Sequence, residues 1–440
     1  MEWIVKLNAF LWGLPMLFLL VGTSLYFTFK LRFIQRFLGS AIKLSVKQSR
    51  SAGAISNFGA LVVALAAMVG TGNIVGVAAA VSTGGPGALF WMVVSAFFAM
   101  ATKYAEAVLA VKYREKNEQG EYVGGPMYVL KNALNLKVCA AVFALATALM
   151  GFADALIQTN SLVDIYRSVF HMPAILTAGI LITLTGAVIL GGITQIARIC
   201  KWLVPFMAVL YIGVCIGVIC LHFSKLPWAL MVIVNSAFSG TALFGGAVGI
   251  TVREAVRYGV SRGVLSNEAG SGSGAIAAAA AQTPNPVRQG LISATTVFWD
   301  TLVICLVSGV TVVIAGDWQS GTLFGAQLVQ SAFNTLPFGS YLLLLSLTLF
   351  AFSTLVGWSY YTAKSVEFCV GAKIERYVYV MWLGMMAVGA CLSPKLVWEL
   401  ADLAIAFMCL PNLLSLWLLR DEVAYLTKYY LRRELVEARR

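Results

Sequence analysis

A glycine-rich stretch, Gly70–Gly76 (GTGNIVG), interrupts a run of apolar residues that otherwise has the composition of a membrane-spanning helix. Lipid offers backbone groups no hydrogen-bond partners, so a loosened backbone at this depth needs protein or a water-filled cavity around it. A half-helix that begins near Thr71, Gly72 and Asn73 presents free N–H groups and the positive end of a helix dipole. We therefore expect these three residues to bind a carboxylate.

A second glycine-rich stretch, Ser239–Gly249 (SGTALFGGAVG), lies in an apolar run of about 33 residues, which is long for one straight span. If this helix also breaks, carbonyl oxygens near Thr241, Phe244, Gly245 and Gly246 become available to an ammonium group. Phe244 is then placed to close over the ligand. Together the two breaks suit a small zwitterion, whereas the plainer alternative for each is close helix packing through small residues.

Two adjacent hydroxyl residues, Ser353 and Thr354, occur in the middle of another apolar segment. Combined with the carbonyl oxygens of Val69 and Gly70, which the first break would free, they form an uncharged oxygen site for a hard monovalent cation. The alternative is that both hydroxyls bond back to their own helix.

Acidic residues inside apolar segments are costly, at roughly 2.5 to 3.5 kcal/mol for an aspartate at mid-helix. Asp154 and Asp300 are of this kind. Asp154 shares a helix face with Gln158, four residues on, which predicts a role in cation binding, proton coupling or substrate contact, against structural pairing. For Asp300 we favour a structural role. Lys103 and Glu106 are expected to form an i,i+3 pair.

The composition identifies a polytopic membrane protein. Of 440 residues, 60% are hydrophobic and 11% charged, and the mean hydropathy is +0.85, far too apolar for a soluble domain. The eight cysteines are scattered without metal-ligand spacing, and there are two histidines. Because no HExxH motif or serine–histidine dyad is visible, we expect neither an enzyme nor an organic cofactor. The net charge of +12 follows from membrane topology and does not indicate nucleic acid.

Eleven apolar segments are predicted, and their loops have a strong charge asymmetry. With the N-terminus outside, 26 of the 31 Lys and Arg residues fall on the cytoplasmic side and four on the outer side. This bias predicts a cell-membrane protein with a cytoplasmic C-terminus. The predicted segments are 8–29, 58–82, 86–112, 138–168, 174–192, 201–223, 226–258, 289–315, 340–363, 376–392 and 395–420.

The two glycine-interrupted helices are the second and the seventh, and they run in opposite directions. This spacing predicts an all-α fold in which 1–440 is one transmembrane domain with a five-plus-five inverted repeat. Helices 2 to 6 and 7 to 11 form the repeats, with helices 2 and 7 broken at mid-membrane. The predicted parts are an extra N-terminal helix (8–29), the repeats (58–223 and 226–420) and a cytoplasmic tail (421–440).

A set of short motifs occurs in order along the whole chain. They are GTGNIVGVA (70–78), GGPGALFWM (84–92), Lys103 and Glu106 with LAVKYR (109–114), GGPMY (124–128), QTNS (158–161), RGVLSNEAGSGS (262–273), PVRQG (286–290), FWDT (298–301) and PNLL (411–414). In the order and spacing of these motifs the chain resembles the alanine or glycine:cation symporters, which have such a fold. The resemblance implies sodium-coupled uptake of a small neutral amino acid such as alanine or glycine. It also implies substrate binding by Thr71–Asn73, Gln158 and Phe244–Gly246, and a sodium site that joins the first break to Ser353 and Thr354.

The chain departs from the family pattern at two places. Asp154 and Ala155 stand where the family tends to have Gly and Asn, and 360–364 reads YYTAK in place of YYGER. The first departure leaves open a proton-coupled or differently selective carrier that uses Asp154. A channel or a non-transporting amino acid sensor is the rival from another class. The exact amino acid, the ion stoichiometry and the oligomeric state stay open.

Overall fold

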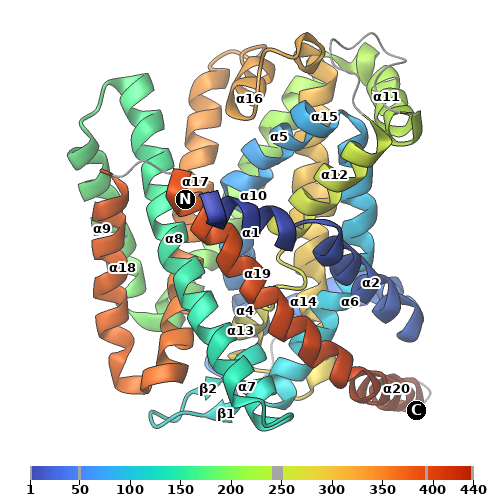
Figure 1. The fold of residues 1–440 in the computed structure, drawn as a ribbon, viewed down its shortest axis with the longest axis vertical. Coiled ribbons are helices and arrows are strands. Elements are labelled where there is room, and N and C mark those ends of the chain that lie inside the picture. The colour runs from blue at the N-terminus through green and yellow to red at the C-terminus, as the bar shows by residue number, and fades with distance from the viewer. Residues whose placement is uncertain (1, 48–50, 240–250, 392–394, 438–440) are drawn as a thin grey trace.

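The computed structural model describes the chain except for residues 1, 48–50, 240–250, 392–394 and 438–440. The described part is helical apart from loops and one two-stranded hairpin (Figure 1). In that hairpin β1 (Glu115–Lys116) pairs antiparallel with β2 (Tyr122–Val123). The long helices surround a centre that contains α4, α13 and α14. This arrangement agrees with the predicted all-α membrane fold.

The helices follow one another in the following order. They are α1 (Glu2–Leu11), α2 (Leu14–Lys30), α3 (Leu38–Val46), α4 (Asn57–Met68), η2 (Thr71–Asn73), α5 (Val75–Gly84), α6 (Gly87–Lys112), α7 (Pro126–Asn132), α8 (Lys137–Phe170), α9 (Ala174–Ile189), α10 (Gly192–Leu221), α11 (Leu226–Ser239), α12 (Val252–Asn267), α13 (Gly274–Ala279), α14 (Pro286–Val297), the π-helix η5 (Phe298–Cys305), α15 (Leu306–Ala315), α16 (Ala326–Phe333), α17 (Gly339–Val370), α18 (Glu375–Gly389), α19 (Lys395–Leu418) and α20 (Arg420–Glu437).

The lengths of the apolar helices support several membrane crossings. Six described helices are long and apolar enough to span a bilayer, and two bent pairs raise the number to eight. The remaining predicted segments correspond to shorter helices, namely α9, α18 and the region of α11 and α12. The chain is therefore a multi-pass membrane protein.

The first predicted break is present. The helix 57–84 is interrupted after Met68, and its two halves, α4 and η2 with α5, are bent by 67°. Gly70 is extended (φ −126°, ψ −163°), and its backbone N–H donates to Asn73 Oδ1 at 3.0 Å. The asparagine side chain thus satisfies a backbone group that the break leaves without a helical partner.

The predicted seventh segment, 226–258, corresponds to two helices, and the second of them continues past its predicted end. α11 ends at Ser239, and a separate helix, α12, begins at Val252 and continues to Asn267. Three arginines and a glutamate lower the hydropathy of α12, so the sequence pattern placed much of it in an inner loop. The predicted break at 239–249 lies, after Ser239, outside the described residues.

A second break separates α12 from α13 over residues 268–273. Glycine is required here for two reasons. Gly270 and Gly272 have φ values of +98° and +79°, and a Cβ on either would meet a neighbour within 2.4 Å. Glu268, which ends α12, has a φ of +53°. The motif SNEAGSGS therefore encodes a break.

The two broken helices lie side by side and run in opposite directions. α5 packs on α12, and α4 packs on α13, so the first half of each helix meets the second half of the other. This antiparallel pairing is the arrangement that two inverted repeats produce.

Lys364, the last residue of the YYTAK departure, is buried at the hairpin end of the molecule. Its ammonium group lies 2.9 Å from Glu121, 2.8 Å from Glu367 and 3.1 Å from Glu375. These carboxylates come from the loop of the hairpin, from α17 and from α18. Lys364 therefore links the hairpin loop, α17 and α18 through ion pairs.

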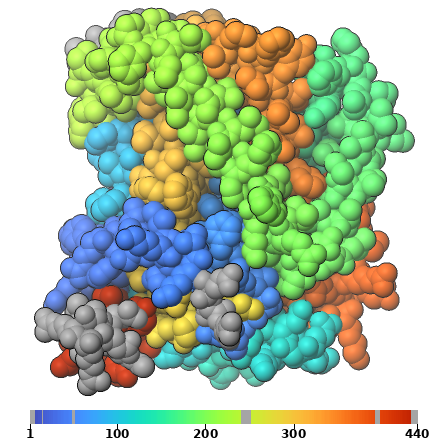
Figure 2. All heavy atoms as spheres, turned by 180° about the vertical axis from the view of Figure 1, so that it is seen from behind, coloured from blue at the N-terminus to red at the C-terminus, as the bar shows by residue number. Residues whose placement is uncertain are grey.

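The C-terminal helix α20 packs at the base of the molecule. Figure 2 shows it in red beside the blue N-terminal segment. Lys30 donates to Asp421 at 2.8 Å, and this hydrogen bond holds the pKa of Asp421 below its usual range. Tyr113 donates to Glu422 at 2.7 Å. The basic tail is thus a helix joined to the core.

The position of α12 also corrects the predicted charge distribution. The predicted topology counts Arg253, Arg257 and Arg262 on the cytoplasmic side, and all three lie on α12. The start of α12 packs beside the turn that joins α5 to α6, where a Cβ on Gly84 would lie 2.9 Å from the Cβ of Tyr258. Without these arginines 23 basic residues remain on the predicted cytoplasmic side, so the bias keeps its sign.

Gly357 allows α17 to pack closely against the first broken helix. A Cβ there would lie 2.6 Å from the backbone nitrogen of Ala67. We expect Gly357→Ala to destabilise the protein by about 1 to 3 kcal/mol, because backbone atoms must shift. Gly384→Ala on α18, which has open space, is the control. Equal melting temperatures of the two purified variants would contradict this packing.

Candidate functional site

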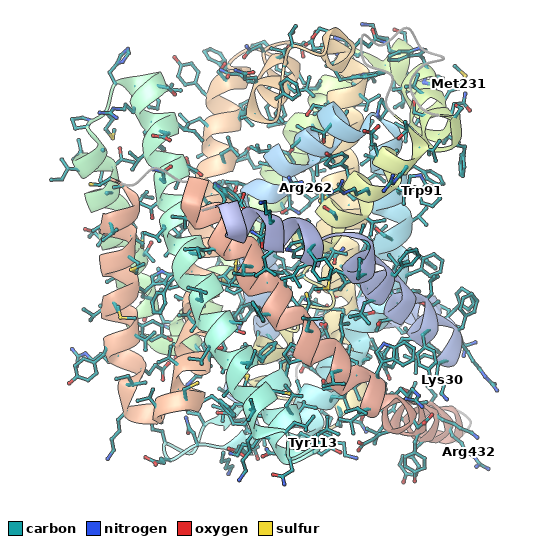
Figure 3. The ribbon with its side chains drawn as sticks, viewed as in Figure 1. Lys30, Trp91, Tyr113, Met231, Arg262 and Arg432 are labelled. Carbon is teal, nitrogen blue, oxygen red and sulfur yellow. The ribbon has the colours of Figure 1, made fainter. Side chains whose placement is uncertain are left out.

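A cavity of about 520 Å³ lies between the two breaks. Its walls come from both broken helices together with α8, α17 and α19, and Figure 3 places Arg262 of α12 near the middle of the molecule. The polar residues that line it are Thr71, Asp154, Gln158, Ser161, Arg262, Ser266, Glu268, Ser271, Thr354 and Asp402, with Gly70 and Gly72.

The N-terminal end of the second half-helix opens on this cavity. Thr71 and Gly72 line it, and the first residues of a helix leave their N–H groups without partners inside that helix. The Thr71 hydroxyl donates to Gln158 Oε1 at 3.4 Å, and Gln158 Nε2 donates to Asp154 Oδ1 at 3.0 Å. Gln158 and Asp154 therefore share a face of α8 as predicted, and a polar chain connects the break to α8.

Asp154 has one carboxylate oxygen without a partner. Oδ2 is buried and makes no hydrogen bond in the described structure, whereas Oδ1 accepts from Gln158. Because the residue lines the cavity, this oxygen is available to a ligand. A buried acceptor of this kind suits an ammonium group or a proton.

Asn73 lies behind the cavity wall and braces the break. It is fully buried, and its amide Nδ2 donates to Asp300 Oδ1 at 2.6 Å and to Ser266 Oγ at 3.1 Å. Ser266 and Thr301 donate to the other oxygen of Asp300 at 2.7 and 2.8 Å. Asp300 thus joins both broken helices to η5, which agrees with the structural role favoured for it.

The predicted cation ligands are brought together by α4 and α17. The Ser353 hydroxyl lies 3.3 Å from the Val69 carbonyl oxygen, and a Cβ on Gly70 would lie 2.7 Å from Thr354 Oγ1. Ser353 and Thr354 also bond back to the Phe350 carbonyl, at 2.8 and 2.9 Å. Each hydroxyl keeps lone pairs, so bonding to the helix does not prevent cation binding.

The predicted cation ligands are neutral oxygens. No group of three or more His, Cys, Asp or Glu side chains with metal-binding geometry occurs among the described residues. Neutral oxygens suit a monovalent cation better than a transition metal.

Several cavity residues were missed from the sequence. Ser266, Glu268 and Ser271 belong to the second break, and Arg262 and Asp402 contribute opposite charges. Two glycines in the motif SNEAGSGS are the signal for these residues in the sequence. The predicted ligands there, Thr241, Phe244, Gly245 and Gly246, lie outside the described residues.

Lys103 and Glu106 bond to the second break instead of forming the predicted pair. Lys103 Nζ donates to the Glu268 carbonyl at 3.2 Å, and Glu106 Oε1 accepts from the Gly270 N–H at 2.7 Å. Asn412 of α19 donates to the same carboxylate oxygen at 2.8 Å. These buried groups satisfy backbone atoms that the break frees.

Comparison with known proteins agrees with this architecture. A model of the sodium:alanine symporter family matches residues 1–439. The sodium/alanine symporter AgcS of Methanococcus maripaludis is 44% identical over 436 residues, which cover 96% of this chain and 95% of AgcS. The amino-acid carrier protein AlsT of Bacillus subtilis is 32% identical over 424 residues, or 95% of this chain and 89% of AlsT.

A solved structure with a similar fold is that of MhsT in complex with L-phenylalanine. It superposes with a TM-score of 0.62 and covers 83% of this chain and 89% of its own, at 14% identity. This likeness concerns the fold alone.

The match of the family model and of these relatives spans almost the entire chain. The chain belongs to the sodium:alanine symporter family, whose members are transporters rather than enzymes. It is a multi-pass secondary transporter that couples amino acid movement to sodium.

The contacts of Asp300 predict its importance for stability. Asp300→Ala leaves the Asn73 amide and the Ser266 and Thr301 hydroxyls buried without their acceptor. We expect a loss of about 3 kcal/mol or more, measured as a fall in melting temperature of the purified protein. Asp421→Ala, at the exposed pair with Lys30, is the control and should melt like the parent. A D300A protein as stable as the parent would show that this network does not hold the break.

Proposed function

We propose that this chain imports a small neutral amino acid, alanine or glycine, together with sodium across the cell membrane. The observation that carries the proposal is the cavity between the two breaks, where a helix N-terminal end faces a carboxylate with a free oxygen. These two features match the opposite ends of a zwitterion. The family membership supports the amino acid and the coupling ion.

The substrate would lie between α5 and α8. Its carboxylate would accept from the backbone N–H groups at Thr71 and Gly72 and from the Thr71 hydroxyl. Its ammonium group would donate to Asp154 Oδ2, and Gln158 would hold the Asp154 carboxylate in place. The cavity also holds Met68, Met150 and Trp358, which bound the room for a substrate side chain.

Sodium would bind where the first break meets α17. Its ligands would be the carbonyl oxygens of Val69 and Gly70 and the hydroxyls of Ser353 and Thr354, with Na⁺ as cargo that supplies the driving force. Ion and substrate then share the broken helix α4–α5. Each would stabilise the same conformation of the break, so each should tighten binding of the other by the same factor.

Transport would proceed by alternating access, with one bundle rocking around the central site. The paired broken helices support this, because both contribute walls to one cavity while α8 and α17 form its other side. We place the N-terminus outside and the C-terminus in the cytoplasm, on the basis of the Lys and Arg distribution.

Uptake into proteoliposomes tests the function. We expect radiolabelled alanine or glycine to accumulate only when sodium is higher outside, and to stop accumulating when an ionophore dissipates the gradient.

Ser353→Ala with Thr354→Val should raise the sodium concentration for half-maximal uptake at least tenfold, because two ligands are lost. The matched control is Ser346→Ala with Thr348→Val on the same helix, where both hydroxyls bond to their own backbone. Accumulation without a sodium gradient would contradict the coupling.

A second candidate, a proton-coupled or differently selective carrier, is favoured by the free oxygen of Asp154. That oxygen would accept a proton as readily as an ammonium group. Binding and pH measurements on one variant distinguish the two roles.

Asp154→Asn removes the negative charge of the side chain and keeps nearly the same size and shape. If Asp154 binds the substrate ammonium, we expect the substrate concentration for half-maximal uptake to rise about ten- to a hundredfold at every pH, because a charge-assisted hydrogen bond is lost. Asp164→Asn, an exposed residue on the same helix, should change nothing. A variant that keeps its affinity but loses the pH dependence of uptake would establish proton coupling instead.

A further inference from the structure

A second cavity, of about 680 Å³, lies away from the central site, between α2, α6 and α12. We call it the flank groove, because α2 lies at the edge of the molecule (Figure 1). Phe18 and Val21 of α2, Phe98 of α6 and Val260 of α12 are among the side chains that line it. Phe18 is 73% exposed, so the groove opens towards the surroundings of the protein.

The packing of the extra N-terminal helix creates the flank groove. α2 packs along α6, and α12 packs along another side of α6, but α2 and α12 touch each other at few points. The space between them is therefore bounded by three helices and left unfilled by protein. A bilayer supplies an apolar occupant for such a space.

Two arginines make one end of the flank groove cationic. Arg253 and Arg257 are one helical turn apart on α12, both line the groove, and both are exposed. No carboxylate of the described residues lies within 4.0 Å of either guanidinium. Glu254, which lies between them in sequence, accepts from the backbone N–H and the hydroxyl of Thr251 at 2.8 and 3.0 Å.

The other polar groups of the flank groove are already engaged. Ser95 donates to the Met92 carbonyl at 3.0 Å, and the Trp91 indole donates to the Ala237 carbonyl at 3.0 Å. Figure 3 shows Trp91 next to α12, towards the edge of the molecule. The guanidinium groups are consequently the polar groups that a ligand in the groove would meet.

We propose that the flank groove binds an anionic phospholipid. The two guanidinium groups hold the headgroup, since arginine forms paired hydrogen bonds with phosphate oxygens. An acyl chain lies between α2 and α6, where Trp91 and Phe98 are about 10 Å apart along the helix axis. The arginines are at the start of α12, beside the turn that joins α5 to α6, so the headgroup sits at that end of the molecule.

A lipid in this groove touches the transport machinery through α12. The helix continues from Arg257 to Ser266, which lines the central cavity and donates to Asp300. The lipid therefore bridges α2, outside the two predicted repeats, and a helix that must move in alternating access. Binding of the lipid does not depend on the substrate that is proposed for the central cavity.

Native mass spectrometry of the purified full chain tests the proposal, with dioleoyl phosphatidylglycerol and dioleoyl phosphatidylcholine as probes. We expect tighter binding of the phosphatidylglycerol. Arg253→Gln with Arg257→Gln should weaken it roughly thirtyfold, since each basic residue contributes about fivefold. Lys373→Gln with Arg376→Gln, two exposed basic residues at the start of α18, is the matched control and should bind like the parent.

Val21→Trp tests the acyl portion, because the indole fills the apolar part of the groove and should weaken binding while both arginines remain. Melting temperatures report whether each variant is folded. Equal binding of the two lipids by the parent, or unchanged binding in R253Q/R257Q, would overturn the proposal. So would a dimer of the chain that excludes lipid from this face. Sodium-driven uptake is measured separately, so a failure here is distinguishable from a failure of the transport assignment.

Discussion

The constraint on which this structure depends is that backbone groups in a membrane interior must find partners within the protein. Two helices give up their regular hydrogen bonds at their middles, and the groups that they free become either ligand sites or buried contacts. Asn73 satisfies the Gly70 N–H in one break, and Glu106 satisfies the Gly270 N–H in the other. Thr71 and Gly72 of the first break and Ser271 of the second line the central cavity. The site thus results from helices with incomplete hydrogen bonding. The polar network around it stabilises these broken helices.

This arrangement also explains why many of the buried charges lie at the breaks. Lys103, Glu106, Glu268 and Asp300 are all buried and lie on or against the two breaks. A buried charge without partners is costly, but here each one bonds to freed backbone atoms or to amide and hydroxyl groups. One carboxylate oxygen of Glu106 and one of Asp154 have no partner in the described structure. Asp154 differs from Glu106 because it lines the central cavity, so its oxygen sets the expected polarity of the ligand.

The parts outside the two repeats have a different role. The extra helix α2 and the C-terminal helix α20 meet at the base through Lys30 and Asp421. Near the other end of the extra segment, Asn8 and Trp12 of the N-terminal segment donate to Glu399 and Asp402 of α19 at 2.7 and 2.9 Å. Of these elements, α2 bounds the flank groove. The bilayer completes the surface that they leave open.

The sequence by itself determined the membrane class, the first break and the shared face of Asp154 and Gln158. Each depends on local composition or helical spacing, which the chain carries directly. The contact of Ser353 with the Val69 carbonyl joins distant parts of the chain, so the packing of α17 on the first break decides it. The second break depended on the tertiary structure, because α12 is polar enough to pass for a loop. Gly270 and Gly272 of that break adopt positive φ, and a Cβ there would meet Leu20 and Pro126 from other parts of the chain. The partners of Lys103, Glu106 and Asn73 are distant in sequence, so only the packing of the two broken helices against each other decided them.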